Sequence, residues 1–486
     1  MNFLNKLKDL TINKTDTEST PPPAELAPLP APEPNTHAPC DAPQIVEPSD
    51  PTPQTCEPIN STPQTTEPVA NPTATIPSPT YEPTTSPHNR TGPIIAGYFA
   101  NWGIYDRNYN PKDVDAVASK LTHVLYSFAD MKEDGEVFNT DPFADREKHF
   151  PAELSVNGQA DTFVEGNHLY GSLKQFYLLK QKNSHLKISL SIGGATLSKS
   201  FPAIAADSVK RQKFVESSVK LLADIGFDGI DIDWEFPQSD KEAAEYALLL
   251  SELRAALDQY GEQVQQADKP RFMLTVAVPC GPENYRKLHL KDMEKYVDVF
   301  YLMAYDYSGD WDQQTGHQAN LFGGPLNTDQ AVNDYMAAGV PASKLVKGIP
   351  MYGRGFTNTD GLDCCYQGIC KGSWEAGQYD YKCLPLPGST EYNDMEKMAS
   401  WCYDPQTREF VTYDSPQVVN GKCQYIKQKQ LAGAMFWELS ADRKYDDPNS
   451  LISVVYNAFE GQIDQTPNHL DFPLSEYINI KSQMQQ

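Results

Sequence analysis

Eight short apolar runs, separated by segments with helical periodicity, constrain the fold of this chain more than any other feature. The runs occupy residues 94–100, 121–128, 187–192, 228–234, 272–278, 297–304, 345–351 and 431–436. Apolar residues recur at helical spacing between them, for example in residues 211–225 and 241–260. Buried strands that alternate with helices are typical of a parallel α/β sheet. Eight such repeats predict a TIM (β/α)8 barrel.

The interval between the seventh and eighth runs is too long for one crossover connection. We predict an inserted α+β subdomain at about residues 354–428 and expect Trp374 to lie in its core. Six cysteines fall within it: Cys364, Cys365, Cys370, Cys383, Cys402 and Cys423. Their crowding favours disulfide bonds over free thiols. A metal site is the weakest alternative, because the cluster has no CxxC pair and no neighbouring histidine.

Residues 21–93 are dense in proline, threonine, serine and glutamate and hold few large apolar side chains. A segment of this composition cannot bury a core. We therefore predict a disordered Pro/Thr-rich arm over residues 1–92, a barrel domain over 93–462 and a C-terminal tail over 463–486.

The chain carries 65 acidic against 40 basic residues, a formal net charge of −25. This excess argues against a nucleic-acid partner and is easier to reconcile with a neutral or cationic ligand. No run of 18 apolar residues is present, so we predict no membrane span. The segment from Met1 to Thr20 lacks the apolar core of a secretory signal, whereas the cysteine cluster and three Asn-X-Thr sequons favour export. We expect an extracellular monomer.

Residues 228–235 read Asp-Gly-Ile-Asp-Ile-Asp-Trp-Glu. Alternate side chains of a strand point to opposite faces, so Asp231, Asp233 and Glu235 share one face. Neighbouring carboxyls that lose solvation titrate as a coupled array, in which one carboxyl holds a proton near neutral pH. An acid catalyst requires such a proton. Asp228, at the entry of the strand, fits a structural role better.

A barrel places its catalytic groups at the carboxyl ends of the strands, and Glu235 ends the fourth. Polar and aromatic residues follow three other strands: Tyr305 and Asp306 the sixth, Tyr352 and Arg354 the seventh, Trp437 and Glu438 the eighth. Where these ends meet, they predict an acidic pocket with aromatic walls. Flat aromatic faces beside carboxyls suit sugar rings.

These residues resemble the signature of the family 18 glycoside hydrolases, the chitinases and their relatives. Residues 228–235 resemble the family's DxxDxDxE motif, and residues 191–194, Ser-Ile-Gly-Gly, resemble its SxGG motif. Residues 303–307, Met-Ala-Tyr-Asp-Tyr, and 436–438, Phe-Trp-Glu, resemble its sixth- and eighth-strand segments. The resemblance covers about residues 94–460 and is closest to fungal-type endochitinases.

The resemblance implies substrate-assisted, retaining hydrolysis of the β-1,4 linkages of N-acetylglucosamine in chitin and chito-oligosaccharides, with no cofactor. Glu235 would protonate the glycosidic oxygen, and the substrate's own acetamido oxygen would attack C1 to give an oxazolinium ion. Asp233 would hold the acetamido N–H with support from Asp231, and Tyr305 would bind the acetamido oxygen. Water activated by Glu235 would then complete the reaction.

The resemblance also implies which residues bind the sugar chain. Trp437 would form the floor under the distorted sugar, and Trp102 would stack toward the non-reducing side. Asp306 and Arg354 would bind hydroxyl or acetyl groups. The other expected substrate-binding residues are Tyr98, Phe128, Gly193, Gly194, Phe236, Met303 and Tyr352.

Two positions depart from the family pattern. Ala195 stands where many members have a tryptophan beside the leaving sugar, and Phe236 stands where a tyrosine is common. The lost aromatic surface at residue 195 is worth roughly 1 kcal/mol of leaving-sugar binding. We therefore expect weaker binding on that side.

Two other functions, and one other role for the acids, remain open. A catalytically inactive chitin-binding lectin is disfavoured because the acid Glu235 is present. An endo-β-N-acetylglucosaminidase that acts on N-glycans fits the inserted subdomain less well than an enzyme for a long linear polymer. A DxD metal site at Asp231 and Asp233 is disfavoured because the apolar alternation places these acids in a strand.

Overall fold

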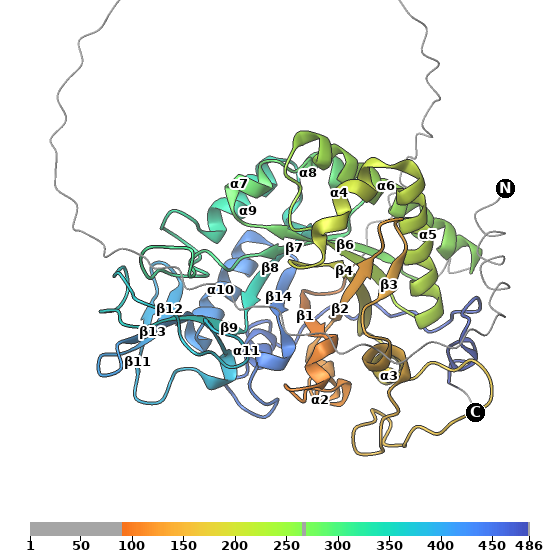
Figure 1. Cartoon of the computed structure of the whole chain (residues 1–486), viewed down its shortest axis with the longest axis horizontal. Helices are drawn as coiled ribbons and strands as arrows, with labels where there is room; N and C mark the ends of the chain where they lie inside the picture. Colours follow the sequence, from red (N-terminus) through yellow and green to blue (C-terminus); the bar gives the residue numbers. More distant parts are fainter. Residues whose placement is uncertain (1–89, 265–268, 485–486) are drawn as a thin grey trace, which may run out of the picture. The chain divides into compact units, whose positions relative to one another are not determined.

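The computed structural model describes residues 90–264 and 269–484, so the predicted arm lies almost entirely outside the described residues (Figure 1). Its centre is a ring of parallel strands in the order β1-β14-β8-β7-β6-β5-β4-β2, closed by pairing between β1 and β2. Their bounds are β1 (Ile94–Ala100), β2 (His123–Met131), β4 (Lys187–Gly193), β5 (Gly229–Asp233), β6 (Met273–Pro279), β7 (Val299–Met303), β8 (Leu345–Pro350) and β14 (Gly433–Trp437). The short strand β3 (Val137–Asn139) pairs antiparallel with β2. The predicted barrel is confirmed.

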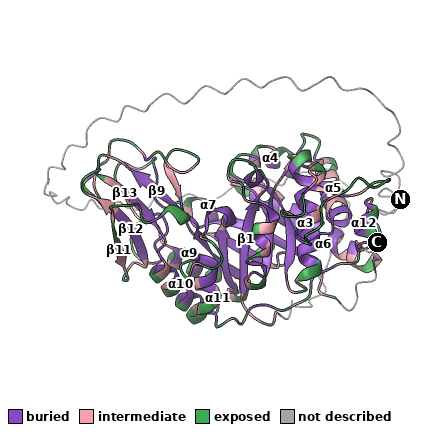
Figure 2. Cartoon of the chain, turned by 90° about the horizontal axis from the view of Figure 1, so that it is seen from below, coloured by how far each residue is buried: buried purple, intermediate pink, exposed green. Residues whose placement is uncertain are grey.

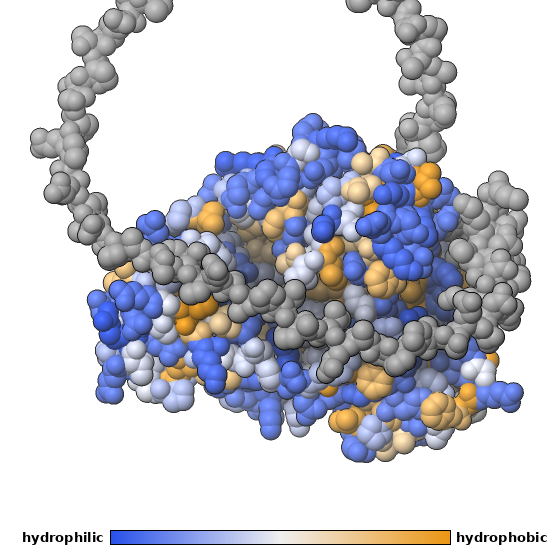
Figure 3. Space-filling model, viewed as in Figure 1, coloured by the Kyte–Doolittle hydropathy of each residue, from blue (hydrophilic) through white to orange (hydrophobic). Residues whose placement is uncertain are grey.

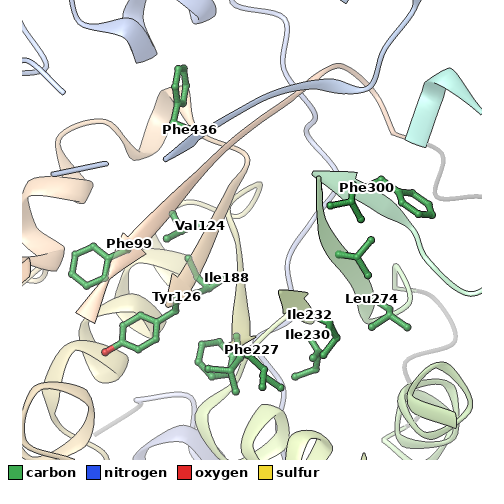
Figure 4. Packing of buried hydrophobic residues seen from close by; sticks show 14 of the residues in the cluster. Phe99, Val124, Tyr126, Ile188, Phe227, Ile230, Ile232, Leu274, Phe300 and Phe436 are labelled. Atoms are coloured by element: carbon green, nitrogen blue, oxygen red, sulfur yellow. The ribbon is translucent and has the colours of Figure 1, made fainter. Parts of the chain in front are cut away.

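Alternation along each strand separates the barrel interior from the layer under the helices. On β1, Ile94 and Tyr98 belong to the inner cluster, whereas Ile95 and Phe99 belong to the outer one. Figure 4 shows side chains of this outer cluster on several barrel strands, among them Phe99, Ile230 and Phe300. On β5 the same alternation directs Ile230 and Ile232 outward and leaves the acidic face to the interior.

Helices cover the outside of the barrel, and their exposed residues face away from the buried strands (Figure 2). Their bounds are α2 (Pro111–Asp115), α3 (Gly171–Lys182), α4 (Phe201–Ala206), α5 (Ser208–Ile225), α6 (Asp240–Gln263), α7 (Pro282–Tyr285), α8 (Leu290–Met293), α9 (Thr328–Ala337), α10 (Pro416–Lys429), α11 (Leu451–Ala458) and α12 (Ile478–Lys481). Helix α5 begins after Asp207, whose side chain accepts hydrogen bonds from the amides of Val209 and Lys210, and ends at Gly226 in the left-handed conformation.

Polar residues dominate the described surface in the view of Figure 3, and hydrophobic residues form small separate groups there. None of the helices within the described ranges combines the length and apolar character that crossing a membrane requires.

The insertion before β14 is an antiparallel sheet in the order β10-β9-β13-β12-β11. Its strands are β9 (Tyr352–Phe356), β10 (Gln378–Asp380), β11 (Thr390–Asp394), β12 (Ala399–Asp404) and β13 (Glu409–Tyr413). Strand β9 follows β8 after one residue, and α10 connects β13 to β14. Residues of the insertion therefore lie next to the carboxyl end of a barrel strand.

The expected disulfide bonds are not confirmed. All seven cysteines in the described part of the chain, the six of the cluster and Cys280, are free thiols. Burial raises the pKa of the Cys370 thiol to about 11 and that of Cys423 to about 12. Buried, neutral thiols of this kind pack as small apolar groups. Cys40 and Cys56 lie outside the described residues.

The C-terminal segment 463–484 binds the amino ends of β4 and β5. The carboxylate of Asp464 accepts a hydrogen bond from Lys187 Nζ at 2.8 Å, and the amide of His469 donates to Asp228 Oδ1 at 2.7 Å. Lys180 Nζ lies 2.9 Å from the other oxygen of Asp228. Asp228 therefore links α3, β5 and the C-terminal segment, as its expected structural role requires.

Candidate active site

A cavity of about 700 Å³ lies at the carboxyl ends of the barrel strands. It gathers most of the site residues expected from the sequence: Tyr98, Trp102, Phe128, Asp233, Glu235, Phe236, Met303, Tyr305, Asp306, Tyr352 and Trp437. Four expected residues do not line it: Asp231, Gly193, Gly194 and Arg354. Each of these four contacts a residue that does.

Asp231 is fully buried behind the cavity and is held by three hydroxyl groups. Its Oδ2 accepts hydrogen bonds from Tyr98 at 3.0 Å and Ser191 at 2.8 Å. Its Oδ1 accepts one from Thr275 at 2.6 Å, across the β5–β6 register. Burial raises the pKa of Asp231, and the three donors oppose this by stabilising its ionised form.

Asp233 is the next acid along β5 and is 4% exposed. Its Oδ1 is buried and has no hydrogen-bond partner among the described residues. Burial, and then the charges of Glu235 and Asp231, raise its pKa well above the usual value for an aspartate. A carboxyl group that lines a cavity and has an unpaired, buried oxygen is suited to bind a ligand N–H or to hold a proton.

Glu235 follows the end of β5, where its backbone amide donates to Ser198 Oγ at 2.9 Å. Burial first, and then the negative charge of Asp306, raise the pKa of its carboxyl to about 7. Glu235 therefore retains a proton over much of the neutral range and can act as an acid there.

Another acid, Asp306, follows β7 and lines the cavity. Its Oδ1 accepts hydrogen bonds from Tyr352 at 2.6 Å and from Arg354 Nε at 2.7 Å. Arg354 thus acts on the cavity through Asp306. The ring of Tyr305 lies beside that of Tyr352, with centroids 6.2 Å apart in an edge-on arrangement.

Aromatic rings form a continuous wall opposite these acids. The ring of Trp437 lies 5.2 Å from that of Tyr98 and 5.7 Å from that of Phe128, and Phe128 is stacked on Trp102 at 6.3 Å. Trp102 is 41% exposed and is available for stacking. Non-prolyl cis peptide bonds precede Phe128 and Phe236 and follow Trp437.

Gly193 and Gly194 permit close approach behind the cavity, and both have positive φ angles, 108° and 91°. A Cβ on Gly193 would lie 2.3 Å from the backbone oxygen of Asp233, and one on Gly194 would lie 2.8 Å from the Phe128 ring. Larger residues would therefore displace two walls of the site.

A second cavity of about 180 Å³ adjoins the first. Trp102, Tyr352, Glu375, Gln378 and Trp437 border both cavities. The expectation that Trp374 is core is wrong: it is 46% exposed and lines the second cavity. Its Nε1 donates to Asp380 Oδ2 at 2.8 Å, which fixes the ring at the edge of the insertion rather than inside it.

Several cavity residues were not expected from the sequence: Asn101, Thr140, Thr196, Leu197, Glu283, Asn284, Tyr307, Leu326, Glu375 and Gln378. Cys280, which is buried, also lines the cavity. Asn101, Thr196 and Glu283 follow the carboxyl ends of β1, β4 and β6. Their positions just after predicted strands could therefore have identified them as cavity residues. Glu375 and Gln378 belong to the insertion, whose position relative to the barrel has no signature in the sequence.

Within residues 90–264 and 269–484, no group of three or more His, Cys, Asp or Glu side chains is arranged to hold a metal ion. The arrangement offers instead one proton-bearing carboxyl, one unpaired carboxyl beside it, and an aromatic wall. These groups suit acid–base chemistry on a ligand with flat apolar faces and an amide.

Comparisons with known proteins agree with this geometry. The model of the glycosyl hydrolases family 18 matches residues 94–442. Endochitinase 1 of Metarhizium robertsii is 45% identical over 414 residues, which cover 83% of this chain and 94% of that protein. Chitinase 1 of Aphanocladium album is 45% identical over 396 residues, 80% of this chain and 90% of that protein. The catalytic domain of psychrophilic chitinase B from Arthrobacter TAD20 superposes with a TM-score of 0.69 at 31% identity, covering 78% of this chain and 97% of that one.

Proposed function

The chain belongs to glycosyl hydrolase family 18, and we propose that it is an endochitinase that hydrolyses the β-1,4 linkages of N-acetylglucosamine in chitin and chito-oligosaccharides. One observation carries this proposal. Glu235, whose pKa is raised to about 7, lies beside the unpaired Asp233 carboxyl in a cavity walled by aromatic rings. The names of the relatives point to the same substrate.

In the first step, the sugar to be cleaved lies over Trp437, and Glu235 donates its proton to the glycosidic oxygen. The bond from C1 to that oxygen breaks as the acetamido oxygen of the same sugar attacks C1. The product is an oxazolinium ion, so the protein supplies no nucleophile. The leaving sugar departs with a new hydroxyl group.

Asp233 and Tyr305 orient the acetamido group during this step. The unpaired Oδ1 of Asp233 accepts the acetamido N–H and stabilises the positive charge that develops on the ring. Tyr305 donates its hydroxyl to the acetamido oxygen and fixes the direction of attack. Asp231, held by three hydroxyl groups, carries the negative charge while Asp233 keeps a proton in the resting state, and it takes up that proton when Asp233 turns to the acetamido group.

In the second step, the ionised Glu235 removes a proton from a water molecule. That water attacks C1 on the face that the leaving sugar has vacated, and the oxazolinium ring opens with net retention of configuration. Glu235 regains its proton in the process and is ready for another cycle.

The two adjoining cavities support action within a chain. Trp102 and Trp374 are half exposed beside the second cavity, where they offer stacking surfaces for further sugar units. We further propose that the chain acts as a monomer outside the cell, with residues 93–462 as the catalytic domain.

Release of fluorophore from labelled chitobiose and chitotriose tests the function. The wild type should release it, and Glu235→Gln, which keeps the shape of the side chain but cannot donate the proton, should reduce kcat by at least about 100-fold. If the folded wild type and Glu235→Gln were equally inactive, the enzymatic proposal would fail and the lectin alternative would take its place.

A further inference from the structure

The charged residues that line the main cavity are all carboxylic acids. They are Asp233, Glu235, Glu283, Asp306 and Glu375. Among the described residues, no lysine, arginine or histidine lines this cavity. A fully N-acetylated sugar chain is neutral, so its recognition does not by itself explain a wall of a single sign.

Three of these acids already have a role or a partner. Asp233 and Glu235 belong to the catalytic group, and Asp306 is bound by Arg354 and Tyr352. Glu283 and Glu375 are exposed, and neither side chain forms an ion pair or a hydrogen bond with a described residue. Two uncompensated carboxyl groups therefore face the cavity.

Glu283 lies on the part of the cavity wall that follows β6. Strand β6 pairs directly with β5, the strand that Glu235 follows. The Glu283 carboxylate folds back over the strand end, because a Cβ on Gly281 would lie only 2.2 Å from Glu283 Oε1. Glu283 does not border the second cavity, whereas Trp102 and Glu375 do. It therefore belongs to the leaving-sugar side and Glu375 to the non-reducing side.

The basic residues that follow Glu283 in the chain do not neutralise it. Arg286 lies 3.5 Å from the carboxylate of Asp334, and Lys287 Nζ donates to Gln238 at 3.0 Å. Glu283 therefore borders the cavity without a basic partner among the described residues.

An independent feature shows that a ligand belongs in this cavity. Asp233 is 4% exposed and lines the same space, and its buried Oδ1 has no hydrogen-bond partner among the described residues. That oxygen needs an N–H donor, which an N-acetylated sugar provides at the reacting position. The neighbouring sugar on the Glu283 side meets a carboxylate without a partner.

We propose that Glu283 determines specificity by binding the protonated amine of a glucosamine unit on the leaving-sugar side. This inference rests on the proposed chitinase function and names its preferred substrate class as partially de-N-acetylated chitin. Cleavage falls preferentially between an N-acetylglucosamine, which supplies the acetamido nucleophile, and a glucosamine, which supplies the ammonium group that pairs with Glu283.

Products from chitosan of about half acetylation, analysed by mass-spectrometric sequencing at mildly acidic pH, test this proposal. The wild type should produce new non-reducing ends enriched in glucosamine relative to the polymer. Glu283→Gln should lower that enrichment about two- to fivefold, the effect of one partly solvated ion pair. About 0.5 M salt should weaken the wild-type enrichment in the same direction.

Two variants serve as controls. Glu262→Gln removes the same charge from the exposed end of α6, outside the cavity, and should keep the wild-type enrichment. Glu375→Gln should change the sugars on the non-reducing side of the cleaved bond and not the new non-reducing ends. The proposal is overturned if the wild type shows no enrichment, or if Glu283→Gln retains it. Failure of the wild type to cleave fully acetylated chitotetraose would instead refute the chitinase function itself.

Discussion

Thr275 offers a test of the two-aspartate arrangement from outside the cavity. It is fully buried on β6, and its hydroxyl donates the 2.6 Å hydrogen bond to Asp231 Oδ1. Among the hydroxyl groups that hold Asp231, only that of Thr275 donates to Oδ1, since those of Tyr98 and Ser191 both donate to Oδ2. Thr275→Val keeps the branched shape of the side chain and removes only the donor.

The loss is that of a hydrogen bond to a charged, buried acceptor, about 1.5–3 kcal/mol. This penalty falls on the ionised form of Asp231, so the proton shared by the two aspartates moves from Asp233 toward Asp231. At about 1.4 kcal/mol per factor of ten, the shift in that equilibrium is roughly 10- to 150-fold. Asp233 is then ionised before the sugar binds, and its negative charge beside Glu235 makes that carboxyl a weaker proton donor.

We expect Thr275→Val to lower kcat at least about tenfold on chitotetraose and to lower the melting temperature. Thr275→Ser keeps the hydroxyl group and controls for the lost methyl group. It should lower the melting temperature while retaining most of kcat. The reasoning is refuted if Thr275→Val remains folded with the kcat and pH profile of the wild type, because Asp231 would then act only as part of the core.

Three further predictions concern Glu235, Ala195 and Asn468. Glu235 must be protonated to act as the acid, and its pKa is raised to about 7, so kcat/KM should fall as the pH rises above about 7; Asp306→Asn, which removes a charge that raises this pKa, should move the decline to lower pH, and an unchanged profile would contradict this. Ala195→Trp should restore a stacking surface worth roughly 1 kcal/mol and lower KM for chito-oligomers about fivefold; unchanged affinities and product patterns would refute the role of residue 195. Asn468 Nδ2 donates to the carbonyls of Lys180, Asn183 and Leu186 at 2.9–3.0 Å, so Asn468→Ala should destabilise the fold by about 1–3 kcal/mol in denaturant unfolding without altering kcat, and an unchanged midpoint would contradict this.

The barrel could be predicted from the sequence because each strand encodes its own two faces. Ile230 and Ile232 alternate with Asp231 and Asp233, and this pattern indicates both the strand and the side on which its acids lie. The structure does not confirm the disulfide prediction, and a count of cysteines could not settle it because such a count contains no distances. Disulfide formation depends on the separation and direction of the two side chains, which long-range packing determines.

Some residues of the candidate site could likewise be predicted from the sequence, and others could not. Residues at strand ends, such as Glu235 and Tyr305, could be anticipated because the ends of parallel strands meet at one face of the barrel. Trp374 could not, because its exposure depends on how the inserted sheet lies against the barrel and on its bond to Asp380. Glu283 looks like an ordinary surface glutamate in the sequence. In the structure, Glu283 is distinguished by its place at the cavity and by the lack of a side-chain partner among the described residues.

The leaving-group dependence of Glu235→Gln tests the central claim most directly. If Glu235 donates the proton to the glycosidic oxygen, the variant should lose about 100- to 10,000-fold in kcat/KM on chitotetraose, whose leaving hydroxyl needs that proton. On a dinitrophenyl chitobioside, whose leaving group needs none, the loss should be smaller by at least about tenfold. Equal losses on the two substrates would contradict the assignment of Glu235 as the proton donor.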